Sequence, residues 1–191
     1  MATRLLRILI LLSIVFPVFA VEVAGVKLED KDRVANADLA LNGAGLRKRA
    51  FFQVYAIGLY LPDTKTVAAE AVAAKGPKRV AIHMLRDLDA DQFSGALADG
   101  IKDNHGEAEA KALEPRVKLL AAIMAEMKET KKGVRITLDW VPAAGTQVTV
   151  DGKATGVPIP GDDFYRALLR IWLGDNPVQA DLKKALLGEK P

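Results

Sequence analysis

Apolar and polar residues alternate along the first third of the chain after residue 20, which is the pattern of β-strands. The alternation predicts strands over residues 37–47 and 50–61, joined by a hairpin whose tip is Lys48-Arg49. Both faces of the second strand are apolar from Phe51 to Leu61. A strand that is covered on both sides lies inside a sheet, so we expect residues 50–61 to form a central strand.

Helical spacing of apolar residues replaces the alternation further on. The pattern predicts a short alanine-rich helix over residues 65–75, a strand over 78–85, and helices beginning at Asp89 and covering about 108–128. Asp89, with Gln92 three residues later, resembles a capping box. Pro115 is a candidate for the true start of the later helix, because proline is tolerated in a first turn but not in a helix interior.

The last third of the sequence predicts a hairpin followed by two helices. The hairpin covers residues 134–140 and 146–150, and the helices cover 162–173, capped by Gly174, and 178–187, opened by Pro177. Strands and helices therefore arrive in blocks, and the clear hairpins are antiparallel. We expect residues 21–191 to form a single α+β domain, with a mainly antiparallel, curved β-sheet packed against a layer of helices.

The first twenty residues have the layout of a secretory signal peptide. Arg4 and Arg7 precede an apolar run that ends in Val18-Phe19-Ala20, a small-x-small cleavage pattern. A retained membrane anchor is the alternative, but the apolar run is short and Pro17 interrupts it. We therefore expect residues 1–20 to be removed, leaving a periplasmic or secreted protein with no stable membrane anchor.

Charge and composition exclude several classes of function. Of the 27 Lys and Arg residues, 25 remain without Arg4 and Arg7, against 24 Asp and Glu, so the exported chain is nearly neutral. This near-neutrality removes the electrostatic argument for a nucleic-acid partner. The absence of cysteine excludes disulfides and thiolate chemistry. We expect a monomer without a cofactor.

Familiar catalytic and metal-binding motifs are missing from the sequence, which has no GxSxG, P-loop or HExxH. His83 and His105 are the only histidines, and we interpret them as a surface or hydrogen-bonded strand residue and a loop residue. The run Asp87, Asp89, Asp91 fits a strand end followed by a helix cap better than a calcium site. We expect neither a metal site nor catalytic residues.

Arg47 is the one candidate for a binding residue that the pattern itself raises. On the face formed by Leu39, Leu41, Gly43, Gly45 and Arg47, the two glycines remove side-chain volume beside the guanidinium. A hollow closed by an arginine suits an amphipathic anion or a polarised carbonyl. Alternatively, Arg47 flanks the turn with Lys48 and Arg49 and points into water. The spacing does not choose between these interpretations.

The same stretch, GAGLR followed by FFQVYAIGLYL, resembles the opening of the chalcone isomerase family. So does the tail, in which IWLG continues into DNPVQADLKKALLG. The resemblance covers nearly all of the chain after residue 20. It implies a large antiparallel sheet curved against a helical layer, with a ligand cleft between them, in agreement with the α+β prediction.

The resemblance does not imply the activity of the plant enzymes, which cyclise a flavonoid precursor using an arginine and several hydroxyl and amide side chains. Arg47 is retained, but Tyr55 stands in place of a threonine, Phe93 of a tyrosine, Gly100 of an asparagine and Ile171 of a threonine or serine. Phe and Ile have no donor or acceptor with which to orient water or hold an enolate. We therefore expect no chalcone cyclisation.

Non-catalytic members of the family bind fatty acids with the arginine and a tyrosine on the neighbouring strand. The resemblance therefore implies a binder of a fatty acid or similar amphipathic carboxylate, with a site made by Arg47, Tyr55, Gly43, Gly45, Phe93, Ile171 and Trp172. Arg47 and Tyr55 share a face if Arg47 pairs with Phe51, and lie on opposite faces if it pairs with Ala50. Isomerisation of another substrate and a structural or partner-binding role in the cell envelope remain alternatives.

Overall fold

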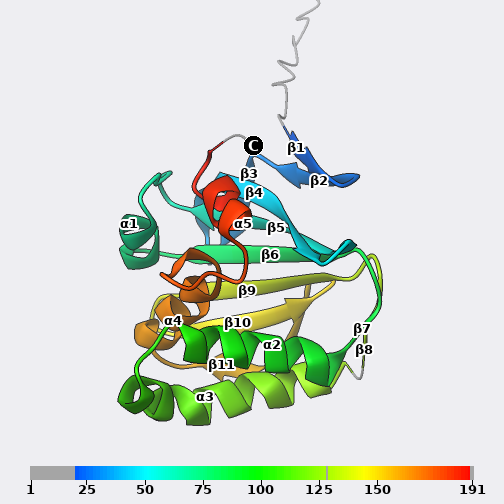
Figure 1. Ribbon diagram of the computed structural model, residues 1–191. Coiled ribbons are helices and arrows are strands. Elements are labelled where there is room, and N and C mark those ends of the chain that lie inside the picture. Colours follow the sequence, from blue (N-terminus) through cyan, green and yellow to red (C-terminus); the bar gives the residue numbers. More distant parts are fainter. Residues whose placement is uncertain (1–19, 128, 190–191) are drawn as a thin grey trace, which may run out of the picture.

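A curled antiparallel sheet forms the centre of the computed structural model, which describes residues 20–127 and 129–189 (Figure 1). Its seven strands follow the order β11-β10-β9-β6-β5-β4-β3. They are β3 (Lys31–Val34), β4 (Ala37–Arg49), β5 (Phe52–Leu61), β6 (Lys78–Met84), β9 (Arg135–Val141), β10 (Gly145–Val150) and β11 (Lys153–Ile159). Two small ribbons pair β1 (Ala20–Val23) with β2 (Val26–Glu29), and β7 (Leu88–Asp89) with β8 (Glu129–Thr130).

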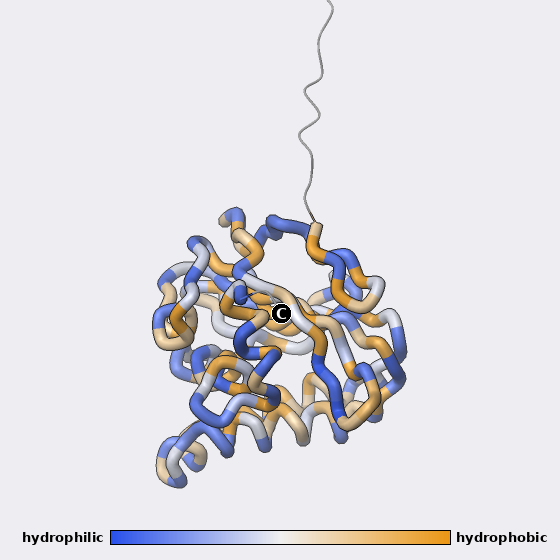
Figure 2. The backbone as a smooth tube through the Cα atoms, turned by 45° about the horizontal axis from the view of Figure 1, so that its top comes forward, coloured by the Kyte–Doolittle hydropathy of each residue, from blue (hydrophilic) through white to orange (hydrophobic). Residues whose placement is uncertain are grey.

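Helices cover one face of this sheet (Figure 1). They are α1 (Ala68–Ala73), α2 (Ala90–Asp103), α3 (Glu107–Ala125), α4 (Asp162–Leu173) and α5 (Ala180–Leu186). Apolar and polar residues alternate along the helices of Figure 2, as a layer with one buried side requires. The α+β prediction of a mainly antiparallel, curved sheet against helices is therefore confirmed.

The main core lies between the inner face of the sheet and α4, α2 and α5. The sheet contributes alternate residues of its middle strands, including Ile57, Leu59, Val80, Ile82, Ile136 and Leu138. Helix α4 contributes eight buried residues, among them Phe164, Tyr165 and Trp172. A helix buried on so much of its surface is enclosed by its neighbours, so α4 fixes the positions of the side chains it presents to β5.

Several predicted elements are confirmed. Strand β5 lies between β4 and β6 and is almost wholly buried, as expected of a central strand. The bounds of α4 agree with the prediction, and Gly174 is its C-cap. The side chain of Asp89 caps α2 by accepting hydrogen bonds from the backbone N–H groups of Asp91 and Gln92.

Other boundaries are wrong, for identifiable reasons. Pro115 lies inside α3, where the apolar face continues on both sides of it. Helix α5 has Gln179 as its N-cap, so Pro177 does not open it. Strand β11 escaped prediction because Gly156 and Pro158 interrupt its pattern, which an edge strand tolerates. The three strands before residue 37 also escaped prediction.

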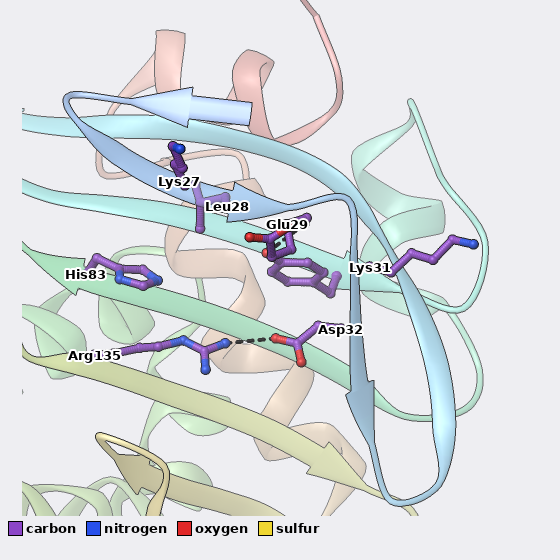
Figure 3. A pocket seen from close by; sticks show the side chains of 8 residues that line it. Lys27, Leu28, Glu29, Lys31, Asp32, His83 and Arg135 are labelled. Atoms are coloured by element: carbon purple, nitrogen blue, oxygen red, sulfur yellow. Dashed lines mark hydrogen bonds and ion pairs between the residues drawn. The ribbon is translucent and has the colours of Figure 1, made fainter. Parts of the chain in front are cut away.

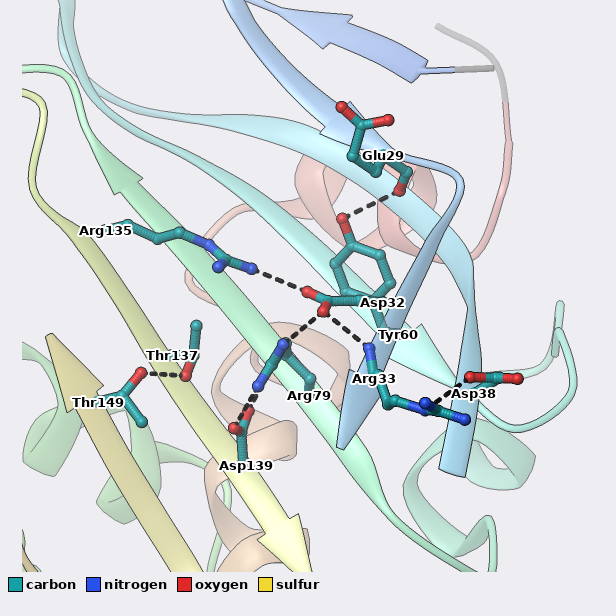
Figure 4. A network of polar contacts seen from close by, with 10 residues as sticks. All are labelled: Glu29, Asp32, Arg33, Asp38, Tyr60, Arg79, Arg135, Thr137, Asp139 and Thr149. Atoms are coloured by element: carbon teal, nitrogen blue, oxygen red, sulfur yellow. Dashed lines mark hydrogen bonds and ion pairs between the residues drawn. The ribbon is translucent and has the colours of Figure 1, made fainter. Parts of the chain in front are cut away.

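A charge network on the face away from the helices holds β3 across the curl of the sheet (Figure 4). Asp32 of β3 contacts the guanidinium of Arg79 on β6 at 2.6 Å and that of Arg135 on β9 at 2.8 Å. Arg79 also donates through Nε to Asp139 of β9 at 2.7 Å.

The pKa of Asp32 is lowered in this network. Burial alone would raise it, but this effect is outweighed by the hydrogen bond and charge of Arg79, the backbone N–H of Arg33 and the charge of Arg135.

Candidate functional site

The pairing of β4 with β5 places Arg47 directly opposite Tyr55. Both side chains therefore lie on the inner face of the sheet, although neither predicted register is right. The pairing shifts by one residue after Arg47 and ends at Arg49 opposite Phe52. The turn is Ala50-Phe51, with Ala50 at a positive φ of 53°, so Lys48-Arg49 ends the strand and is not the tip.

The hydroxyl of Tyr55 is a polar group among the buried apolar side chains of the core. Its hydroxyl accepts a hydrogen bond of 3.0 Å from the indole Nε1 of Trp172, and its ring meets that of Phe93 edge to face at 6.3 Å between centroids. Burial raises the pKa of Tyr55, while the Trp172 bond and the nearby charge of Arg47 offset part of the rise. Phe93 and Trp172 therefore meet at Tyr55, which lies opposite Arg47 on the inner face of the sheet.

Arg47 meets the side chain of Gln179, which the sequence did not single out. Its Nη1 donates to the carbonyl oxygen of Lys48 and, at 3.3 Å, to Oε1 of Gln179. The backbone N–H of Lys48 donates to the same Oε1 at 2.8 Å. Among the described residues, no carboxylate lies within ion-pair distance of Arg47. Two donors thus converge on one oxygen, as they would on an oxygen of a bound carboxylate.

The hollow expected beside Gly43 and Gly45 is filled by α5. A Cβ on Gly43 would lie 2.2 Å from the carbonyl oxygen of Ala185, and one on Gly45 would lie 2.6 Å from Cδ1 of Leu182. The glycines therefore let a helix approach the strand closely, and the prediction that they leave open space is wrong. Gln179 also donates to the carbonyl oxygen of Leu46 at 3.0 Å, which ties the start of α5 to β4.

Ile171 packs against α2 and not around Arg47. A Cβ on Gly100 would lie 2.8 Å from Cγ2 of Ile171, so the isoleucine occupies the space that the glycine leaves. These are two of the positions at which the plant enzymes carry an amide and a hydroxyl. Here the two residues fill each other's space, which leaves no polar group at either position.

Two hollows in the described residues lie elsewhere. One, of about 310 Å³, is on the face away from the helices, between the β1–β2 ribbon and the sheet (Figure 3). Its lining includes Tyr60, whose pKa burial raises to about 12, and His83, whose pKa is lowered by burial and by Arg135 opposite it. The other, of about 390 Å³, lies between α1, α4 and α5. Neither is lined by Arg47 or Tyr55.

Within the described residues, no group of three or more His, Asp or Glu side chains is placed to hold a metal ion. No helix in that part of the chain is both long enough and apolar enough to cross a membrane.

Comparison with known proteins agrees with the architecture. The sequence model of the family described as chalcone isomerase-like matches residues 20–188. No curated protein matches the sequence. Among solved structures, the chain resembles the fatty-acid binding protein AtFAP1 of Arabidopsis thaliana, with a TM-score of 0.67 and 14% identity over 85% of this chain and 92% of that one. At that identity the likeness concerns the fold.

Proposed function

The chain belongs to the chalcone isomerase-like family, and we propose that it is a non-catalytic member that binds a fatty acid or a similar amphipathic carboxylate. The observation that carries the proposal is the surroundings of Arg47. Its guanidinium has no carboxylate partner among the described residues and shares one oxygen of Gln179 with the backbone N–H of Lys48. A ligand carboxylate that replaced this amide would receive charge-assisted hydrogen bonds.

The neighbouring residues suit the rest of such a ligand. The Tyr55 hydroxyl lies beside Arg47 and would become a further donor to the headgroup. Phe93 and Trp172 form the apolar surroundings in which a hydrocarbon tail is favoured. The tail reaches them only if α5 moves away from Gly43 and Gly45, so the binding proposal includes displacement of α5. The fatty-acid binding function named for the plant protein of the same fold supports this ligand class.

Binding without chemistry agrees with the residues on the helices. Phe93 and the packed pair of Gly100 and Ile171 offer no group to orient water or hold a developing negative charge.

We also propose that the protein works outside the cytoplasm as a monomer. The signal peptide expected over residues 1–20 lies outside the described residues except for Ala20, the first residue of β1.

Lipid extraction and a binding titration test the proposed function. We expect mass spectrometry of the exported protein to find a copurifying fatty acid, and added palmitate to change the fluorescence of Trp172, isolated by Trp140→Phe. Arg47→Ala removes the charge-assisted bonds and should weaken palmitate binding at least about tenfold. The control is Arg33→Ala, which changes an exposed arginine of β3 that pairs with Asp38 of β4. No copurifying lipid, together with equal affinity in Arg47→Ala and the control, would contradict the proposal.

Gln179→Ala should raise the affinity for palmitate about tenfold, because the variant loses hydrogen bonds that hold α5 over the site, each worth about 0.5–1.5 kcal/mol. The amides of Lys183 and Leu187, which bond within this helix, should exchange with solvent faster. The control is Asn176→Ala, which removes a donor to Asp103 outside the site. A fall in affinity would mean that Gln179 contacts the ligand and does not compete with it.

A further inference from the structure

The tip of the β4–β5 hairpin exposes two adjacent phenyl rings. Phe51 is 88% exposed and Phe52 is 51% exposed, and their ring centroids are 4.9 Å apart. A two-residue turn projects them from the end of the sheet, at the cyan hairpin of Figure 1. Single exposed apolar residues are common, but two adjacent rings at a projecting tip expose continuous apolar surface to water, which is unfavourable.

Three exposed cations surround these rings. Lys48 and Arg49 precede the turn, and the guanidinium of Arg86 lies 4.8 Å from the centre of the Phe52 ring. Arg86 comes close because β6 pairs with β5 and Leu85 donates to the carbonyl oxygen of Val54. Within the described residues, none of the three cations has an ion-pair partner. Asp87, which follows Arg86 in the sequence, accepts a hydrogen bond from the backbone N–H of Lys132.

We propose that this basic aromatic tip, defined as Lys48, Arg49, Phe51, Phe52 and Arg86, docks the protein reversibly on a bilayer surface that contains anionic lipids. Phenyl rings partition into the boundary between headgroups and acyl chains, and cations beside them are attracted to negatively charged headgroups. The combination resembles the two-part signal that peripheral membrane binding requires, an apolar insertion together with basic charge.

The shape of the tip favours a bilayer over a protein partner. A specific protein interface buries about 1,200–2,000 Å² on a matched surface. One ring on the two-residue turn and one on the first residue of β5 make a narrow projection, which inserts readily into a fluid surface. The tip also lies on the same hairpin as Arg47, so docking would bring the proposed binding site to a source of amphipathic ligands. The docking inference rests on exposure and charge alone, and it holds whether or not Arg47 binds a carboxylate.

Vesicle sedimentation tests the inference, using the exported protein and vesicles of phosphatidylcholine alone or mixed equally with phosphatidylglycerol. We expect at least about tenfold tighter binding to the mixed vesicles, weakening as salt is added. The double change Phe51→Ser and Phe52→Ser should reduce binding to the mixed vesicles at least tenfold. Arg49→Gln with Arg86→Gln should remove the preference for phosphatidylglycerol. The control is Val157→Ser, at a valine that is 71% exposed on β11.

The possible outcomes separate docking from ligand binding. Arg47→Ala should bind mixed vesicles like the unaltered protein, even if its affinity for palmitate is lost. Failure to bind mixed vesicles, or equal binding by the Phe51/Phe52 variant and the Val157 control, would overturn the inference. A crosslinker at position 51 that captures a protein while vesicles are ignored would overturn it as well. The substituted side chains are exposed, and circular dichroism will show that each variant is folded.

Discussion

Arg79→Met is expected to lower the free energy of unfolding by about 3–5 kcal/mol at pH 7, the usual cost of removing one partner from a buried ion pair. The Arg79 side chain is 12% exposed and bridges Asp32 and Asp139, whose side chains are 22% and 7% exposed. Methionine matches the aliphatic part of the arginine side chain but leaves the Asp139 carboxylate buried without its partner. Chemical denaturation of the variant and the unaltered protein measures the difference.

The stability deficit of Arg79→Met should shrink in acid. The pKa of Asp32 is lowered in the folded protein, so its contribution to stability is complete above its unfolded pKa of about 3.9 and disappears as the pH falls through the folded value. Protonation therefore removes the benefit of Arg79 from the unaltered protein and the unpaired charges from the variant. The two unfolding free energies should converge as the pH falls below about 4.

Arg33→Met is the matched control, because it also removes an arginine that pairs with an aspartate. Arg33 and Asp38 are 67% and 77% exposed, and exposed pairs contribute about 0–1 kcal/mol. A deficit in Arg79→Met that equals this control, or that stays constant between neutral and acidic pH, would show that the charge network does not hold β3. A large but constant deficit would assign the loss to packing.

The sequence predicts those parts of the fold that are determined by residues close together in the chain. The alternating residues of β5, the cap at Asp89 and the helical periodicity of α4 each depend on neighbours within a few positions. The strands before residue 37 are short, and what holds β3 is a set of charges from β6 and β9. Nothing local in the sequence could place Asp32 beside Arg79.

Some residues of the candidate site could likewise be predicted from nearby sequence, and others depend on contacts between distant parts of the chain. That Arg47 and Tyr55 share a face follows from the pairing of two neighbouring strands, and the chalcone isomerase-like resemblance identified both residues. The role of Gln179 depends on where α5 packs, more than a hundred residues away in the chain. The sequence predicts empty space at Gly43 and Gly45, because an absent side chain gives the same pattern whether a ligand or a helix occupies its place.

The two faces of the sheet therefore have different roles. The face away from the helices carries a charge network in which Asp32 of β3 pairs with Arg79 and Arg135, and Arg79 also pairs with Asp139. The inner face carries Arg47, which lies beside Tyr55 and donates to the neutral amide of Gln179 at the start of a short helix. Arg47 is bonded to a neutral amide, and α5, which covers it, is short. A ligand carboxylate is a stronger acceptor than the amide, so its binding would favour the state in which it has replaced Gln179.

Gly43→Ala is expected to lower the free energy of unfolding by about 3 kcal/mol, at the upper end of overpacking costs. The new Cβ would lie 2.2 Å from the carbonyl oxygen of Ala185 and 2.6 Å from that of Leu186. Backbone atoms cannot rotate away, so α5 must move as a unit. The movement would break the 2.7 Å hydrogen bond from the Asn42 amide to Leu186 and expose part of the surface that Leu182 and Leu186 bury.

Gly45→Ala is the matched control for this change, because it adds the same methyl group two residues further along β4. Its Cβ would meet Cδ1 of Leu182 at 2.6 Å, the far end of a side chain that can change rotamer, and Cβ of Ala185 at 3.0 Å, a milder overlap than that with the backbone at Gly43. We expect this variant to lose about 1 kcal/mol. Denaturation curves give both values, and hydrogen exchange at the amides of α5 shows whether the helix has moved. Equal losses in the two variants, or unchanged exchange in Gly43→Ala, would mean that β4 yields and α5 stays in place.

Palmitate should restore part of the lost stability in Gly43→Ala. A ligand that requires α5 to be displaced binds most tightly to a protein in which the helix has already moved.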